Sequence, residues 1–111
     1  MKKNIKFFIL CLTFSLSIFS QNLNEKKVLI MWGGWEGHQP ELFVEQVKNW
    51  LENEDIDYVV SNDLNDYANF EFLSKFNLII QSVTMSQLTN EQEFSLLKAI
   101  SGGIGLSLIH I

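Results

Sequence analysis

Side chains able to do chemistry gather in one short segment of this sequence, between Trp32 and Pro40. The imidazole of His38 can act as a general base or a metal ligand, and the carboxylate of Glu36 can orient it or accept hydrogen bonds from sugar hydroxyls. The indoles of Trp32 and Trp35 offer flat apolar faces of the kind that stack on pyranose rings. This combination predicts a site for a hydroxylated ligand, with His38 and Glu36 as the candidate catalytic residues.

Three glycines, Gly33, Gly34 and Gly37, lie in the same segment. Because they carry no side chain, the backbone can pass close to a ligand there. Their spacing is not the Gly-x-Gly-x-x-Gly spacing of a dinucleotide-binding loop. We take the three glycines, with Trp32 and Trp35, as candidate substrate-binding residues, and whether the site holds a metal or a cofactor is left open.

Each of these side chains also has a purely structural interpretation. Trp32 ends an apolar run and could belong to the core, whereas Trp35, Glu36 and His38 could be exposed loop residues. Both interpretations stay open from the sequence alone.

The flanking sequence predicts the elements that position this segment. Val28 to Trp32 is a continuous apolar run, typical of a strand buried on both faces of a parallel sheet. Pro40 suits the first turn of a helix, because its missing N–H costs nothing there. Apolar residues then recur along one helical face, namely Phe43, Val47, Trp50 and Leu51. We therefore expect a strand, a ligand-facing loop and a helix, with Trp50 in the core.

The next part of the chain continues the alternation of strands and helices. Its composition predicts a strand at 57–61, a polar and turn-rich segment at 62–68, a short helix at 69–76 and a strand at 77–83.

The last predicted helix begins after Thr89, which can cap it, and ends at Gly102-Gly103 in a left-handed cap. Phe94, Leu97 and Ile100 are expected to form its apolar face. A fourth strand is expected to start at Ile104.

This order of elements implies parallel strands, right-handed crossovers and helices on both faces of the sheet. The predicted fold class is α/β, a flavodoxin-like three-layer α/β/α domain with a parallel sheet, truncated after about four strands. Ligands of such sheets bind beyond the carboxyl ends of the strands, where the segment 33–40 falls. Thr84, Met85 and Ser86, after the third strand, face the same crevice.

The N-terminal segment 1–20 has the layout of a secretory signal peptide. Met1 to Lys6 is basic, and Phe7 to Phe19 is apolar but shorter than the roughly 20 residues that a membrane span needs. We expect a secreted or periplasmic protein with no membrane attachment after cleavage. Cys11 is the only cysteine and lies in this segment, so no disulfide or cysteine nucleophile is expected in the remainder.

Charge limits the classes of partner. Loss of residues 1–20 removes three Lys, so five Lys and no Arg face thirteen Asp and Glu, a formal net charge of −8. Such a surface repels phosphate backbones and anionic lipid. Nucleic acid is therefore a poor partner, whereas a neutral small-molecule carbohydrate meets no such objection. A homo-oligomer of the intact protein stays open.

Several stretches resemble ThuA-like domains, the trehalose-utilisation family. The resemblance covers nearly all of residues 26–106, and the string Gly-Gly-Trp-Glu-Gly-His at 33–38 is its most specific part. The other matching stretches are 76–80, 88–92 and 101–106. The resemblance implies a fold of the class I glutamine amidotransferase-like superfamily and a role in the metabolism of trehalose and related disaccharides.

The match ends in the last few residues. ThuA-like domains usually carry a Gly-Trp-His-Gly-Gly segment after the fourth strand, whereas this chain has Ser107-Leu108-Ile109-His110-Ile111. We carry no function onto His110. Residues 106–111 resemble the translation of a common sequencing adaptor and are predicted to be a non-native tail, with a genuine short strand as the alternative.

The leading hypothesis is a secreted ThuA-like domain protein involved in carbohydrate utilisation. The alternative is a non-catalytic carbohydrate-binding or accessory domain of a larger secreted sugar-processing protein. A third interpretation, an amidotransferase-type enzyme, needs a Cys at or beyond the turn after the fourth strand. Whether the protein is an enzyme is left open.

Overall fold

The centre of the fold is a sheet of four parallel strands in the order β2-β1-β3-β4. In this computed structural model the described residues are 25–34, 37 and 39–108. The strands are β1 (Lys27–Gly34), β2 (Asp57–Ser61), β3 (Leu78–Thr84) and β4 (Gly105–Leu108). In the register of the sheet, Val28 of β1 lies between Tyr58 of β2 and Leu78 of β3. The fold is therefore α/β with an all-parallel sheet, as predicted.

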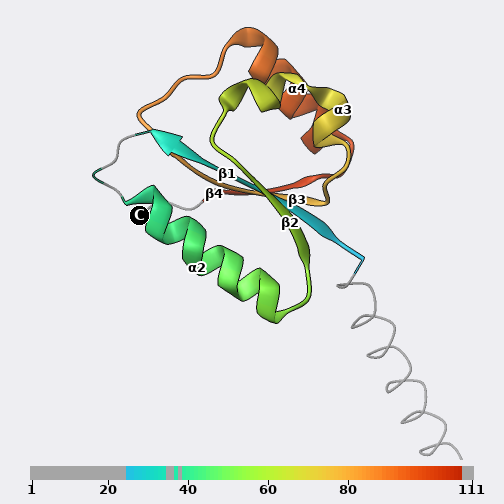
Figure 1. The fold of residues 1–111 in the computed structure, drawn as a ribbon. Coiled ribbons are helices and arrows are strands. Elements are labelled where there is room, and N and C mark those ends of the chain that lie inside the picture. The colour runs from blue at the N-terminus through green and yellow to red at the C-terminus, as the bar shows by residue number, and fades with distance from the viewer. Residues whose placement is uncertain (1–24, 35–36, 38, 109–111) are drawn as a thin grey trace, which may run out of the picture.

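Helices cover both faces of this sheet (Figure 1). The helix α2 (Pro40–Asn53) lies on one face. The 3-10 helix η2 (Leu64–Ala68) and the helices α3 (Phe70–Leu73) and α4 (Asn90–Ser101) lie on the other. Side chains alternate along a strand, so Ile30 of β1 packs against α2, while Leu29 and Met31 pack on the opposite side.

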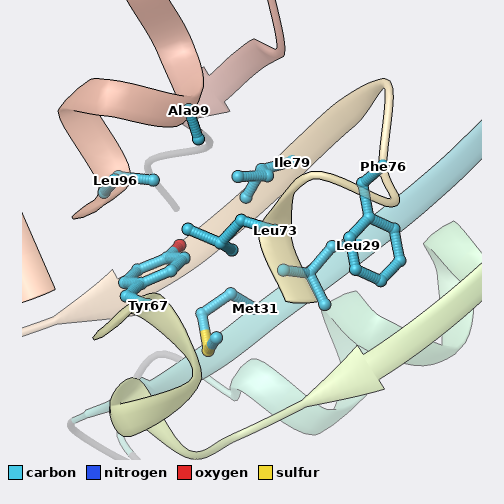
Figure 2. Packing of buried hydrophobic residues seen from close by; sticks show 8 residues of the cluster. All are labelled: Leu29, Met31, Tyr67, Leu73, Phe76, Ile79, Leu96 and Ala99. Atoms are coloured by element: carbon cyan, nitrogen blue, oxygen red, sulfur yellow. The ribbon is translucent and has the colours of Figure 1, made fainter. Parts of the chain in front are cut away.

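The two faces have cores of different composition. The α2 face is built from aliphatic side chains and Phe43. The other face contains Tyr67, which is fully buried among aliphatic and aromatic neighbours (Figure 2). The hydroxyl of Tyr67 donates a hydrogen bond to Gln81 Oε1 of β3 at 2.5 Å. This bond provides the partner that a buried hydroxyl needs, and it ties η2 to the sheet.

Local signals placed the starts of both long helices correctly. Pro40 is the first residue of α2, as predicted. Thr89 caps α4 and forms a capping box with Gln92, in which each side chain bonds the backbone of the other residue. Gly103 follows α4 with a φ of 115°, which confirms the predicted left-handed termination.

The segment between β2 and β3 differs from the prediction. The turn-rich stretch 62–68 contains η2, and the helix expected over 69–76 is limited to Phe70–Leu73. Asn69 caps this short helix by accepting a bond from Phe72 N at 3.1 Å. The polar composition of this segment gave no indication that Tyr67 is fully buried and that the segment packs around it.

Three predicted core positions are wrong. Trp50 is 54% exposed, Phe94 is 72% exposed and Leu97 is 55% exposed. In α2 the buried stripe runs through Phe43, Val44 and Leu51, and Trp50 lies at its flank.

In α4 the inward face carries one large apolar residue, Leu96, beside polar and small ones. Gln92, Ser95, Leu96 and Ala99 are its buried residues. With this face inward, Gln92 Nε2 donates to Asn65 Oδ1 of η2 at 3.0 Å, and Leu96 and Ala99 pack in the core. The small side chains of Ser95 and Ala99 then allow η2 and α3 to approach closely.

The predicted signal peptide, 1–20, lies outside the described residues. Residues 106–108 of the predicted tail belong to β4 and pair with β3, while 109–111 also lie outside. Among the helices of the described part of the chain, none is both long enough and apolar enough to cross a membrane.

Candidate functional site

A hollow of about 780 Å³ lies at the carboxyl end of β1, between this strand, the start of α2 and the end of β2. Its size is that of a small-molecule site. The residues that line it are Trp32, Gly33, Gly34, Gln39, Pro40, Glu41, Leu42 and Asn62. The hollow therefore forms at the edge of the sheet where the sequence placed the ligand site.

Gly34 fixes the floor of the hollow because β1 and β3 approach closely there. Gly34 pairs with Thr84 at a φ of +93°, and a Cβ on Gly34 would lie 1.8 Å from the carbonyl oxygen of Thr84. No other residue fits that position. Gly33 beside it has open space around it, since a Cβ on Gly33 would lie 4.0 Å from its nearest neighbour, the carbonyl oxygen of Asn62. Gly34 is thus required by the sheet, whereas Gly33 leaves its backbone open to the hollow.

The first turn of α2 forms one wall. Gln39 precedes the helix in a left-handed conformation, with φ 50° and ψ 56°, and its side chain does not cap the helix. The N–H groups of Leu42 and Phe43 donate to Gln39 O at 3.2 and 3.4 Å, and Pro40 has no N–H to offer. Glu41 adds a negative charge to this turn. An anion would therefore find few donors and an opposing charge here, although helix N-termini usually attract anions.

Asn62 forms the opposite wall, directly after β2. The turn around it is held by Ser61, whose hydroxyl donates to Asp66 Oδ2 at 2.5 Å and accepts from Asp63 N at 3.2 Å. Asp63 Oδ1 in turn accepts from Asn65 N at 3.0 Å. These bonds fix the backbone on both sides of Asn62 and leave its amide exposed.

Three polar side chains at the hollow have no hydrogen-bond partner among the described residues. They are the amides of Gln39 and Asn62 and the carboxylate of Glu41, all exposed. Together they offer donors and acceptors, and the half-buried indole of Trp32 adds an apolar surface.

Of the residues predicted for the site, the structure brings Trp32, Gly33 and Gly34 together at the hollow. Gly37 is described and exposed. Trp35, Glu36 and His38 lie outside the described residues, so their roles remain predictions from the sequence.

Sequence reasoning missed four residues of the hollow, Gln39, Glu41, Leu42 and Asn62. Glu41 and Leu42 looked like ordinary first-turn residues, and Asn62 lies 28 positions after Gly34 in the chain. The position of Asn62 directly after the second strand was the available signal, because parallel strands end at a common edge.

The loop after β3 does not join this hollow. Met85 is 85% exposed with a φ of 57°, and neither Met85 nor Ser86 lines the hollow. Thr84 does not line the hollow either, although its backbone lies close to Gly34.

Two tyrosines away from the hollow have perturbed acidity. Burial raises the pKa of Tyr67 well above its ordinary value. A hydrogen bond donated to Glu52, with smaller effects of burial and of the charges of Glu52 and Glu45, raises the pKa of Tyr58.

Within residues 25–34, 37 and 39–108, no three side chains gather in a way that could hold a metal ion.

Comparison with known proteins returned no matching family model, no matching curated protein and no matching solved structure.

Proposed function

We propose that this chain is a ThuA-like domain that binds a neutral carbohydrate in the hollow at the carboxyl end of β1. The observation that carries the proposal is the lining of that hollow, in which an indole lies beside exposed amides and a carboxylate without hydrogen-bond partners among the described residues. Sugars present C–H faces to aromatic rings and hydroxyls to such polar groups, so this lining suits them.

The proposed family is supported by the strand order as well as by the sequence. The order β2-β1-β3-β4 agrees with the first four strands of the flavodoxin-like order 2-1-3-4-5. We infer a flavodoxin-like fold on this ground, and the resemblance of residues 26–106 to ThuA-like domains points the same way.

Charge favours an unphosphorylated sugar. The first turn of α2 carries Glu41, and the N–H groups of Leu42 and Phe43 are already directed to Gln39 O. A phosphorylated sugar would bring its charge against this carboxylate without strong donors to offset it. The acidic composition of the chain acts in the same direction.

A catalytic role would rest on His38 and Glu36. In this proposal His38 acts as a general base toward a sugar hydroxyl or a water molecule, and Glu36 orients its imidazole. A binding or accessory role would need neither group to transfer a proton. We propose that either role is carried out in the secreted or periplasmic compartment, after removal of residues 1–20.

Isothermal titration with trehalose tests the proposal. The variant Trp32→Ala should bind about tenfold more weakly than the wild type, because one aromatic contact and its buried area are lost. Trp50→Ala is the control for the loss of a tryptophan, since Trp50 does not line the hollow, although it is more exposed than Trp32. Equal affinities for Trp32→Ala and wild type, or no binding by the wild type, would contradict the proposal.

Product analysis separates the catalytic role from the binding role. If the domain is catalytic, trehalose incubated with the wild type yields a new product and His38→Ala yields none. Saturable binding without product in the wild type assigns the accessory role.

A further inference from the structure

A small hollow of about 270 Å³ lies where α4 meets the end of η2 and the start of α3, in the helical layer on the face of the sheet opposite to α2 (Figure 1). Ala68 and Phe70 line one side of it, and four residues of α4 line the other, namely Glu91, Phe94, Ser95 and Lys98. Small-molecule sites are usually larger, about 300–1,000 Å³. The size of this hollow suits a single side chain of a partner protein.

Exposed aromatic rings stand beside this hollow. Phe94 is 72% exposed and Phe70 is 37% exposed, whereas Ser95, with its short side chain, is buried and forms the base. A contiguous apolar surface with a polar rim is typical of a site for another protein. Phe94 therefore offers a projecting side chain directly beside a hollow of a size to receive one.

Two opposite charges flank Phe94 along α4. Glu91 lies about one turn before Phe94 and Lys98 about one turn after it. Lys98 Nζ lies 4.2 Å from the centre of the Phe70 ring, which holds this positive charge at the rim of the hollow. Among the described residues, neither charge has an ion-pair partner. The surface thus has a negative end and a positive end on either side of an aromatic ring.

We propose that this surface binds a second copy of the chain, with the two α4 helices antiparallel across a twofold axis. In the register that sets Glu91 opposite Lys98 of the second copy, Phe94 lies opposite Ser95 of the second copy, because the two pairs have the same midpoint along α4. Each Phe94 then enters the hollow of the other copy, and each charge pair forms twice. A single register therefore satisfies both the shape and the charge of the surface.

The charges distinguish this occupant from other proteins. A basic partner would meet Lys98 and an acidic partner would meet Glu91, whereas a second copy presents each of these residues with its opposite. The formal net charge of the chain, −5, opposes self-association in general. The attraction therefore has to come from the local pairing of Glu91 with Lys98 and from the burial of Phe94. This inference is independent of the carbohydrate site, whose hollow lies at the start of α2.

Sedimentation equilibrium of the whole chain, from micromolar to millimolar concentrations, tests the dimer. The wild type should show a monomer–dimer equilibrium. Phe94→Ala should raise its dissociation constant at least about tenfold, because an aromatic side chain is removed from both copies. Trp50→Ala is the matched control: it removes an exposed aromatic residue of α2, on the opposite face of the sheet, and should leave the dissociation constant unchanged.

Charge reversal tests the register. Glu91→Lys alone and Lys98→Glu alone each place like charges opposite one another twice and should weaken the dimer at least about tenfold. An equimolar mixture of the two single variants restores opposite pairs, as does the double variant Glu91→Lys/Lys98→Glu, and both should dimerise like the wild type. The double variant also lacks the contact of Lys98 with Phe70, so its recovery excludes the loss of that contact as the cause.

A monomeric wild type over this concentration range overturns the inference. A dimer that Phe94→Ala leaves unchanged also overturns it, because another surface then holds the copies together. Weak dimers in both the mixture and the double variant overturn it as well, because Glu91 and Lys98 then do not face one another.

Discussion

The helices that leave the carboxyl edge of the sheet after β1 and after β3 begin in different ways. Before α2, Gln39 adopts a left-handed conformation and gives no side-chain cap, and the polar groups beside it have no hydrogen-bond partners among the described residues. Before α4, Thr89 and Gln92 form a capping box, and Gln92 also bonds Asn65. At the second junction, the start of α4, the side chains of Thr89 and Gln92 are bonded within the protein, whereas at the first, the start of α2, those of Gln39 and Glu41 have no partner among the described residues.

This difference indicates which of two polar loops at the same edge of the sheet is the better candidate for a ligand site. Both loops are polar, both follow a buried strand and both looked able to face a ligand from the sequence alone. The distinguishing property is whether the polar groups are already bonded within the protein, because bonded groups gain little from a ligand. Function is therefore expected at the start of α2, and stability is expected to depend on the start of α4.

The largest effect is expected at Gly34, where the first junction leaves the sheet. Gly34→Ala places a Cβ against the carbonyl of Thr84 at a positive φ and should lower the free energy of unfolding by about 3 kcal/mol. Urea denaturation measures this value. Gly33→Ala serves as the control and should cost less, because Gly33 also has a positive φ, +150°, but no atom lies closer than 4.0 Å to its added Cβ. Equal losses in the two variants would show that the close approach to β3 is not the cause.

A smaller effect is expected at Tyr67, which closes the β3 side. Tyr67→Phe leaves Gln81 Oε1 without its donor and should cost about 1–2 kcal/mol near neutral pH. Burial raises the pKa of Tyr67 above its unfolded value of 10.0. The folded chain thus keeps the phenol protonated while the unfolded chain ionises, so this contribution is complete below pH 10 and declines as the pH rises toward the folded pKa.

Unfolding measured at several alkaline pH values checks this dependence. Between about pH 10 and 11 the stability of Tyr67→Phe should decline less steeply than that of the wild type. Tyr58→Phe is the comparison: it removes a surface phenol whose pKa is raised by its bond to Glu52, and it should change the decline less than Tyr67→Phe does. Parallel declines of Tyr67→Phe and wild type would contradict the assignment.

Loss of the cap of α4 should have an effect of about 1 kcal/mol. Thr89→Ala removes the acceptor for Gln92 N, and helix caps contribute about this much. Thermal or urea unfolding measures the change, and trehalose affinity should stay the same. A clear loss of affinity would show that the second junction takes part in binding after all.

The smallest effect, of opposite sign, is expected at the corresponding position of α2. Gln39→Gly relieves a left-handed conformation, with φ 50°, and should raise the free energy of unfolding by about 0.5 kcal/mol. The same variant loses an amide at the hollow and should bind trehalose more weakly. Reduced stability would mean that the amide of Gln39 supports the fold rather than the ligand site.

Much of the fold was predictable because its signals are local. A continuous apolar run identified β1, Pro40 identified the start of α2, and Thr89 identified the start of α4. The rotation of a helix about its axis was less accessible, because it depends on distant partners. Phe94 was expected to be inside and is exposed, since the inward face of α4 is the one on which Gln92 bonds Asn65 and Leu96 and Ala99 pack in the core.

The candidate site was predictable in part for the same reason. Trp32, Gly33 and Gly34 stand next to one another in the sequence and were identified together. Asn62 comes from a different connection and reaches the hollow only through the pairing of β2 with β1. No local pattern encodes that proximity.

The pairing of β1 on both sides has a consequence for how the chain acquires its structure. β1 pairs with β2, which begins at Asp57, and with β3, which begins at Leu78. Neither partner can be reached by a hairpin, so the central strand must wait for distant segments, and such non-local pairing slows folding. During synthesis one edge of β1 has no partner strand until β3 (Leu78–Thr84) has been made. In this interval the nascent chain is prone to association with other chains.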